Sequence, residues 1–202
     1  MLIKVRRGGW PLSDDNQNRD MMIVMKGGKG EPYLYVKKNM KEHYYNIDIK
    51  WSRDRKGLMC SSEITTPLSE RGCIEVATPP EFPKGIPGIW SPEHLFTASV
   101  VSCFMTTFLA IAENSKLAFT GFTCRAAGKL EEADGRMIMS SVALYPEVTV
   151  TEAGSREKAV RVMERAEKSC LISHSIKSTV TLDAAVIVDA KVGADDSSQM
   201  VH

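Results

Sequence analysis

The stretch that decides the fold is Ser91-Pro92-Glu93-His94-Leu95-Phe96-Thr97-Ala98-Ser99-Val100-Val101-Ser102-Cys103. Its first three residues form a helix start. Ser91 is a favoured N-cap, Pro92 suits the first helical position, and Glu93 interacts well with the positive end of the helix dipole. The apolar run continues past Cys103, so we predict a helix from Pro92 to about Ser115, about 35 Å long.

This helix is a candidate membrane span. From His94 to Ala112 it carries no Asp, Glu, Lys or Arg, and a bilayer requires about 20 apolar residues. Hydroxyl and thiol side chains dilute the run, however, and Glu93 and Glu113 bound it without a basic flank. We therefore predict a central helix buried on nearly all sides, with Cys103 at core depth and no membrane partner.

Composition narrows the class of protein further. The chain has 202 residues, 43% of them hydrophobic, and a formal net charge of +1, which is typical of a globular chain and gives no basic field for nucleic acid. Five cysteines cannot all pair, and they are too few for a disulfide scaffold. We expect mostly free thiols in a reducing compartment. No signal peptide is visible at the start, so we expect a cytoplasmic location.

Three regions follow from the pattern along the chain. Residues 1–40 have a modest basic excess and few strand-like runs, and we interpret them as an N-terminal arm outside the core, more typical of a solvated tail than of an RNA-binding segment. Residues 41–188 form the domain. Residues 189–202 are polar and form a C-terminal tail.

The domain is predicted to be α+β, with the order β-β-β-α-β-β-α-β. Alternation through Tyr45, Ile47, Ile49 and Trp51 predicts a half-buried first strand. Two short strands, residues 58–65 and 73–78, precede the central helix, and Asp134-Gly135 predicts a hairpin after it. A second helix begins near Ser155. Its apolar stripe is Ala159, Met163, Ala166 and Cys170, and one closing strand covers residues 180–188.

Searches for cofactor and metal motifs find no site. The glycine-rich stretches lack the spacing of a phosphate loop, and Cys170 with His174 supplies only two of the ligands that zinc needs. We predict no cofactor and no metal. Cys60, Cys73 and Cys124 lie on strand-like segments, where a cysteine usually behaves as a small buried hydrophobe.

The central helix resembles that of the OsmC/Ohr family of thiol peroxidases (osmotically induced protein C and organic hydroperoxide resistance protein). In that family a Pro-Glu pair opens the helix and a reactive cysteine follows ten residues after the Glu, as Cys103 follows Glu93. A second family motif, Cys-Pro-x-Ser, corresponds to Cys170-Leu171-Ile172-Ser173, with Leu171 in place of the proline. The element order also matches over residues 42–188.

The resemblance implies a hydroperoxide reductase. Cys103 would be oxidised to a sulfenic acid, Cys170 would condense with it to a disulfide, and an external dithiol would reduce that disulfide. A family arginine follows the first strand, with Arg53 as the best match and Arg55 as the alternative. Since an unperturbed thiol is only about 3% ionised at pH 7, this cation would activate Cys103, and Glu93 would orient it.

Geometry and composition add two expectations. Ten helical residues separate Glu93 from Cys103 by about 15 Å, so a shared site requires a second copy, as in the family's intertwined homodimer. Together with the behaviour of the family that the chain resembles, apolar neighbours including Phe104, Phe108 and Met163 suit organic hydroperoxides. Two alternatives remain: an OsmC-like redox sensor or small-ligand-binding protein without efficient turnover, and a structural dimer with inert cysteines.

Overall fold

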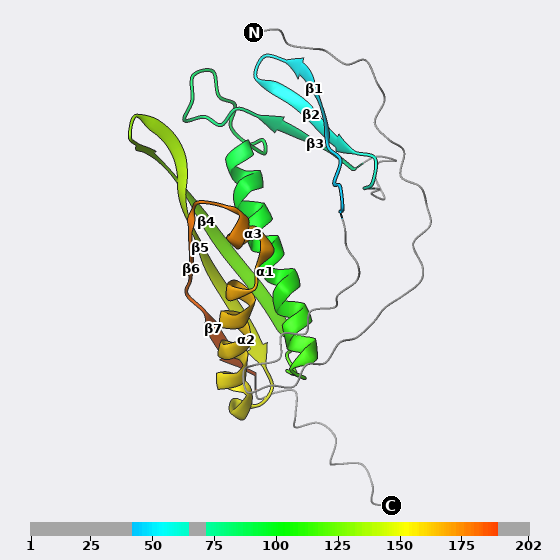
Figure 1. The fold of residues 1–202 in the computed structure, drawn as a ribbon, viewed down its shortest axis with the longest axis vertical. Coiled ribbons are helices and arrows are strands. Elements are labelled where there is room, and N and C mark those ends of the chain that lie inside the picture. The colour runs from blue at the N-terminus through cyan, green and yellow to red at the C-terminus, as the bar shows by residue number, and fades with distance from the viewer. Residues whose placement is uncertain (1–41, 65–71, 190–202) are drawn as a thin grey trace, which may run out of the picture. The chain divides into compact units, whose positions relative to one another are not determined.

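The computed structural model describes residues 42–64 and 72–189. The chain divides into two compact units, Met1–Tyr44 and Tyr45–His202. The predicted arm (residues 1–40) and nearly all of the predicted tail lie outside the described residues, so these boundaries stay predictions. The elements of the second unit (Figure 1) are β1 (Asp48–Arg53), β2 (Lys56–Ser61), β3 (Gly72–Ala77), α1 (Pro92–Asn114), β4 (Gly121–Ala133), β5 (Arg136–Val150), a 3-10 turn (Ala153–Ser155), α2 (Arg156–Lys168), α3 (Leu171–Ser175), β6 (Thr179–Leu182) and β7 (Ala185–Val188).

The first three strands form an antiparallel sheet in the order β1-β2-β3. The predicted turn after β1 is present, and Asp54 adopts a left-handed conformation with φ of 48°. The predicted half-burial of β1 is wrong, because every residue of the strand is exposed. Ile49 and Trp51, on the expected core face, are 67% and 71% exposed. The described residues leave this face of the strand uncovered.

The second sheet is built on the long hairpin of β4 and β5. Asp134 and Gly135 join the strands with φ values of 50° and 72°, the two consecutive left-handed residues that an Asp-Gly hairpin turn requires. This turn was predicted. β6 and β7 both pair with β5 in parallel, which gives a mixed sheet behind the two helices.

One closing strand was predicted, and the structure divides it into β6 and β7. Both segments keep the same register against β5, with Leu182 opposite Leu144 and Ala185 opposite Glu147. That register places Pro146 opposite the interruption, and a proline has no backbone N–H to donate to a ladder. The ladder therefore breaks for about one residue pair and then resumes.

The start of α1 confirms the predicted cap. Ser91 Oγ accepts a hydrogen bond from the His94 backbone N–H at 3.3 Å, and His94 Nδ1 accepts one from the Ser91 N–H at 3.4 Å. This is a capping box with histidine in place of the usual Glu or Gln. The Ala77 N–H donates to the carbonyl of Trp90 at 2.9 Å, so the end of β3 is fastened directly before the helix.

Only one stripe of α1 is buried, which corrects the expectation of burial on nearly all sides. The stripe consists of Val100, Phe104, Phe108 and Ala112. It packs against β4, β5 and α2, and the Phe108 ring stacks on Phe122 with centroids 4.7 Å apart. By length and composition α1 could cross a membrane, but its buried stripe forms the centre of the core. Other sides carry exposed apolar residues, among them Met105 and Leu109 at 38% and 41% exposure.

We predict that Phe108→Ala lowers the free energy of unfolding by about 3–5 kcal/mol, because it leaves a cavity among rings that cannot fully close it. Met137→Ala is the control, since Met137 is 50% exposed near the hairpin turn. Urea denaturation followed by circular dichroism measures both. Equal effects of the two substitutions would contradict the packing of this core.

Candidate functional site

Cys103 lies in the middle of α1, one residue before the buried ring of Phe104. Its side chain is half-buried, not at core depth as predicted. The reason is the one-sided packing of the helix: a residue next to Phe104 is turned by about 100° from the buried stripe. This position makes the thiol accessible while it remains in contact with the elements that follow α2.

Cys170 is placed against Cys103 by a break between two helices. The predicted second helix was expected to carry Cys170 on its stripe, but α2 ends at Lys168, and Cys170 is the N-cap residue of the short α3. Leu171 therefore occupies the first position of a helix, where proline is also favoured. The replacement of proline by Leu171 is compatible with this local structure. The Cys170 side chain is fully buried.

The two thiols interact directly. Burial raises the pKa of Cys170 above the ordinary thiol value, a hydrogen bond and charge interaction with Cys103 raise it further, and Ser173 opposes the rise. Within the described residues the buried Ser173 hydroxyl has no other hydrogen-bond partner, so it is a donor that lies beside the sulfur. The predicted pair of Cys103 and Cys170 is thus brought together from two parts of the chain 67 residues apart.

Glu93 lies apart from this pair, in the first turn of α1. Its Oε2 atom is buried and has no hydrogen-bond partner in the described part of the chain. It contributes to a cavity of about 710 Å³ between the start of α1 and the β4–β5 hairpin. The larger apolar side chains of the cavity wall are Trp90, Val101, Leu130, Met137 and Met139, and Glu81, Glu93 and His94 add polar groups to it. Cys103 and Cys170 are not in that wall.

The two candidate arginines flank the β1–β2 turn, and both are exposed. Arg53 pairs with Lys56 across the turn. Arg55 lines a hollow of about 550 Å³ together with Trp51 and Pro92, the first residue of α1. Among residues 42–64 and 72–189, neither arginine forms an ion pair with Glu93. The structure therefore brings the thiols together but does not assemble the four predicted residues into one site.

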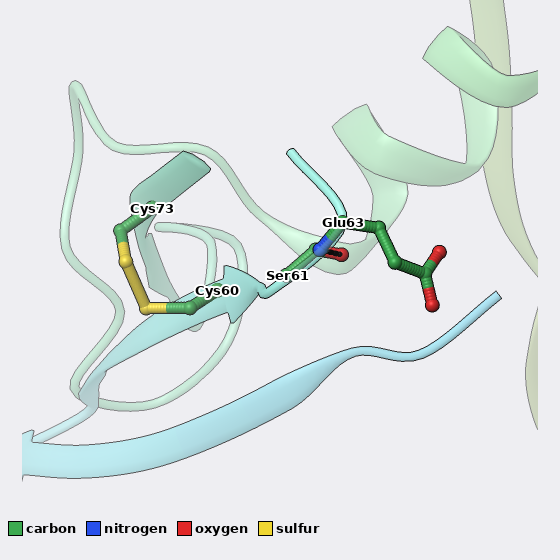
Figure 2. The surroundings of a disulfide bond; sticks show 4 residues. All are labelled: Cys60, Ser61, Glu63 and Cys73. Carbon is green, nitrogen blue, oxygen red and sulfur yellow. Dashed lines mark hydrogen bonds between the residues drawn. A yellow bond between two sulfur atoms is a disulfide. The ribbon is translucent and has the colours of Figure 1, made fainter. Parts of the chain in front are cut away.

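A disulfide joins Cys60 to Cys73, and sequence reasoning missed it (Figure 2). These cysteines were interpreted as free, buried passengers, so that interpretation is wrong. The pairing follows from the β2–β3 register, which sets the two residues directly opposite each other. Sequence spacing alone does not give this register. Cys124 is a half-buried free thiol on β4, and burial raises its pKa.

The described residues hold no cluster of three or more His, Cys, Asp or Glu side chains that could bind a metal ion. His174, the one residue considered with Cys170 as a zinc ligand, has its Nε2 atom 2.7 Å from the carbonyl oxygen of Lys168.

A family model for OsmC-like proteins matches residues 85–185. The chain belongs to the OsmC-like family. The matched residues run from the loop before α1 to the start of β7, so they include the helix start, both interacting thiols and the β4–β5 hairpin. No curated protein matches the chain at a significant level.

Solved structures share the fold of this OsmC-like chain. An OsmC-like protein of unknown function from Vibrio cholerae has a TM-score of 0.60 at 20% identity, covering 71% of this chain and 99% of that one. An organic hydroperoxide resistance protein from Legionella pneumophila gives 0.56 at 20%, covering 72% and 98%. Another from Elizabethkingia anophelis, with thiocyanate bound, gives 0.55 at 19%, covering 74% and 100%.

The different environments of the thiols predict different reactivity. With reduced protein at pH 7.5, we expect iodoacetamide to modify Cys103 first and Cys170 roughly tenfold or more slowly, because Cys170 is both buried and poor in thiolate. Raising the pH to 9 should speed Cys170 more than Cys103. Peptide mass spectrometry over time measures both sites, with half-buried Cys124 as an internal comparison. Faster labelling of Cys170 than of Cys103 would contradict the placement.

Proposed function

We propose that this protein is a thiol-dependent peroxidase that reduces organic hydroperoxides to alcohols. The observation that carries the proposal is the placement of half-buried Cys103 on α1 near buried Cys170 at the start of α3, close enough to raise its pKa. One thiol is accessible and the other is buried beside it, which suits a peroxide-reacting cysteine and a resolving cysteine. Family membership and the neighbours named organic hydroperoxide resistance proteins support the same chemistry.

The reaction has three balanced steps. The Cys103 thiolate attacks the distal peroxide oxygen, the O–O bond breaks, and the leaving alkoxide takes a proton to become an alcohol. The resulting sulfenic acid condenses with Cys170, forming a disulfide and releasing water. An external dithiol then restores both thiols by exchange and is itself oxidised to a disulfide.

We propose that a homodimer completes the site. Within one chain Glu93 is about 15 Å along the helix from Cys103, and its buried Oε2 lacks a partner in the described residues. A second, antiparallel copy of α1 would bring its own Cys103 to the Glu93 cavity. The arginine next to the start of α1 would then face that sulfur. Arg55, which shares a hollow with Pro92, is better placed for this role than Arg53.

Exposed apolar surfaces support a second copy as the occupant. One lies on β1, where Ile49 and Trp51 are exposed, and another on α1 at Met105 and Leu109. Burying such side chains stabilises an assembly by about 25 cal/mol for each Å² of apolar area removed from water. A shared interface would also explain why β1 alternates like a half-buried strand.

The substrate preference is carried by the cavity and not by the core rings. Phe104, Phe108 and Met163 are fully buried inside one chain, so they do not contact a substrate directly. The expectation that these three residues would favour organic hydroperoxides is therefore corrected. The Glu93 cavity offers Trp90, Val101 and Leu130 instead. An apolar alkyl or aryl group fits this wall better than water or hydrogen peroxide does.

We expect turnover of cumene hydroperoxide with dithiothreitol, followed by loss of peroxide. Cys103→Ser should reduce the rate to that of buffer with dithiol. Cys170→Ser should consume about one equivalent of peroxide and then accumulate sulfenic acid, because no resolving thiol remains. Cys124→Ser is the matched control and should keep the full rate. Turnover by Cys103→Ser would refute the proposal, and a stoichiometric disulfide without sustained turnover would identify a sensor instead.

The dimer is tested by light scattering, and the shared site is tested by removing the charge of each candidate arginine. At micromolar concentration we expect twice the mass of one chain, and Trp51→Glu should shift the protein towards the monomer.

Arg55→Ala should slow the reaction with peroxide by about 10²–10³-fold, the size of effect seen when a positioned charge is lost. Arg53→Ala should have a much smaller effect. A monomeric and fully active wild type would rule out the shared site.

A further inference from the structure

The Cys60–Cys73 disulfide is a second redox group, separate from the thiols of the helices. It links the middle strand β2 to the edge strand β3, with the Cα atoms 4.1 Å apart (Figure 2). Such a short Cα separation identifies directly opposed residues of an antiparallel pair. The peroxidase cycle proposed above does not use it.

The disulfide lies on the charged side of its sheet. Cross-strand partners project from the same face, so Asp48, Cys60 and Cys73 share one face, while Ile49, Met59 and Ile74 share the other. On the disulfide face, Lys56 forms an ion pair with Glu75 at 3.2 Å. A partner that covers the apolar face of this sheet would therefore leave the disulfide facing away from the contact.

A hollow gives access to the sulfur of Cys60. It has a volume of about 400 Å³ and is formed over β1 and β2 by Asp48, Ile49, Lys50, Leu58, Cys60 and Ser62. The strand order matters here, because β1 and β3 lie on opposite sides of β2. A thiolate that enters over β1 therefore reaches Cys60 Sγ from the side opposite to Cys73, which is the direction that in-line displacement requires.

The hollow carries one charge of each sign, from Asp48 and Lys50, and Lys50 is the group that an incoming thiolate meets favourably. Lys50 is exposed and contributes to the same wall as Cys60, and an ammonium group attracts an anionic nucleophile as it approaches. Cys73 is not in the wall of this hollow, so it is the natural leaving group. Both cysteines are half-buried, and of the two only Cys60 lines the hollow over β1.

We propose that Cys60–Cys73 is a reversible thiol–disulfide exchange site, opened from the β1 side by an external dithiol. The dithiol thiolate bonds to Cys60 Sγ, the S–S bond breaks, and Cys73 leaves as a thiolate that takes up a proton. The second thiol of the reagent then attacks the mixed disulfide and releases Cys60, so two electrons pass to the protein and the reagent becomes a disulfide. The reverse exchange with an oxidised dithiol closes the bond again.

Opening this bond has a structural consequence at the start of α1. β3 is an edge strand of the described sheet, and without the disulfide the end bearing Cys73 is held by its ladder to β2 and by the hydrogen bond from the Gly72 N–H to the Ile64 carbonyl at 2.6 Å. Its other end bonds to Trp90, next to the cap residue Ser91. Reduction should therefore increase the hydrogen exchange of β3 amides and, less strongly, of the first turn of α1.

The test uses the full chain in its native state with dithiothreitol in excess, quenched with acid, alkylated and mapped by peptide mass spectrometry. We expect Cys60 and Cys73 to become alkylated without denaturant, and Lys50→Glu to slow their appearance on the order of fivefold. Lys177→Glu, an exposed charge reversal outside this sheet, is the matched control and should leave the rate unchanged. After removal of the dithiothreitol, excess oxidised glutathione should restore the bond by exchange.

Several results would overturn the proposal. The disulfide would be purely structural if it opened only in denaturant, and the entry route over β1 would be wrong if Lys50→Glu reacted as fast as the wild type. Failure of excess oxidised glutathione to close the bond in the folded protein would exclude reversible exchange. Because the mapping resolves Cys60 and Cys73 from Cys103 and Cys170, the outcome does not depend on whether the protein reduces peroxides.

Discussion

The rest of the structure depends on the one-sided burial of α1. Val100, Phe104, Phe108 and Ala112 press against the β4–β5 hairpin and α2, and this stripe fixes the rotation of the helix about its axis. Once the rotation is fixed, Cys103 must lie beside the stripe and not in it. The capping box at Ser91 fixes the helix along its axis as well, so the position of Glu93 relative to Cys103 follows from the backbone alone.

Features that depend on neighbouring residues could be predicted from the sequence. The chemistry of a few consecutive residues determines the cap at Ser91 and the Asp134-Gly135 turn. The spacing of Cys103 from the start of the helix is likewise a local feature of the sequence. The placement of Cys170 near Cys103 could be anticipated through the family resemblance, although the helix was predicted to run through it. A helix end that depends on tertiary contacts is poorly determined by local propensity.

Features that depend on distant residues could not be predicted. The Cys60–Cys73 bond requires the β2–β3 register, and the gap between β6 and β7 requires Pro146 to lie opposite it. The exposure of Ile49 and Trp51 contradicted the alternation of β1, because burial was inferred from a pattern that does not say which molecule covers the face. Each of these errors concerns the partner of a residue and not its secondary structure.

The mixed pairing of β5 has a consequence for the order in which the molecule is assembled. β5 meets β4 through a two-residue turn. Its pairing with β6 and β7 must wait for more than 25 residues beyond its end, which include α2 and α3. Such non-local closure is slow compared with hairpin formation. Cys170 lies within that late segment. We therefore expect a folding chain to present Cys103 for a time without Cys170 beside it, an interval in which an oxidised Cys103 has no neighbouring thiol to stop further, irreversible oxidation.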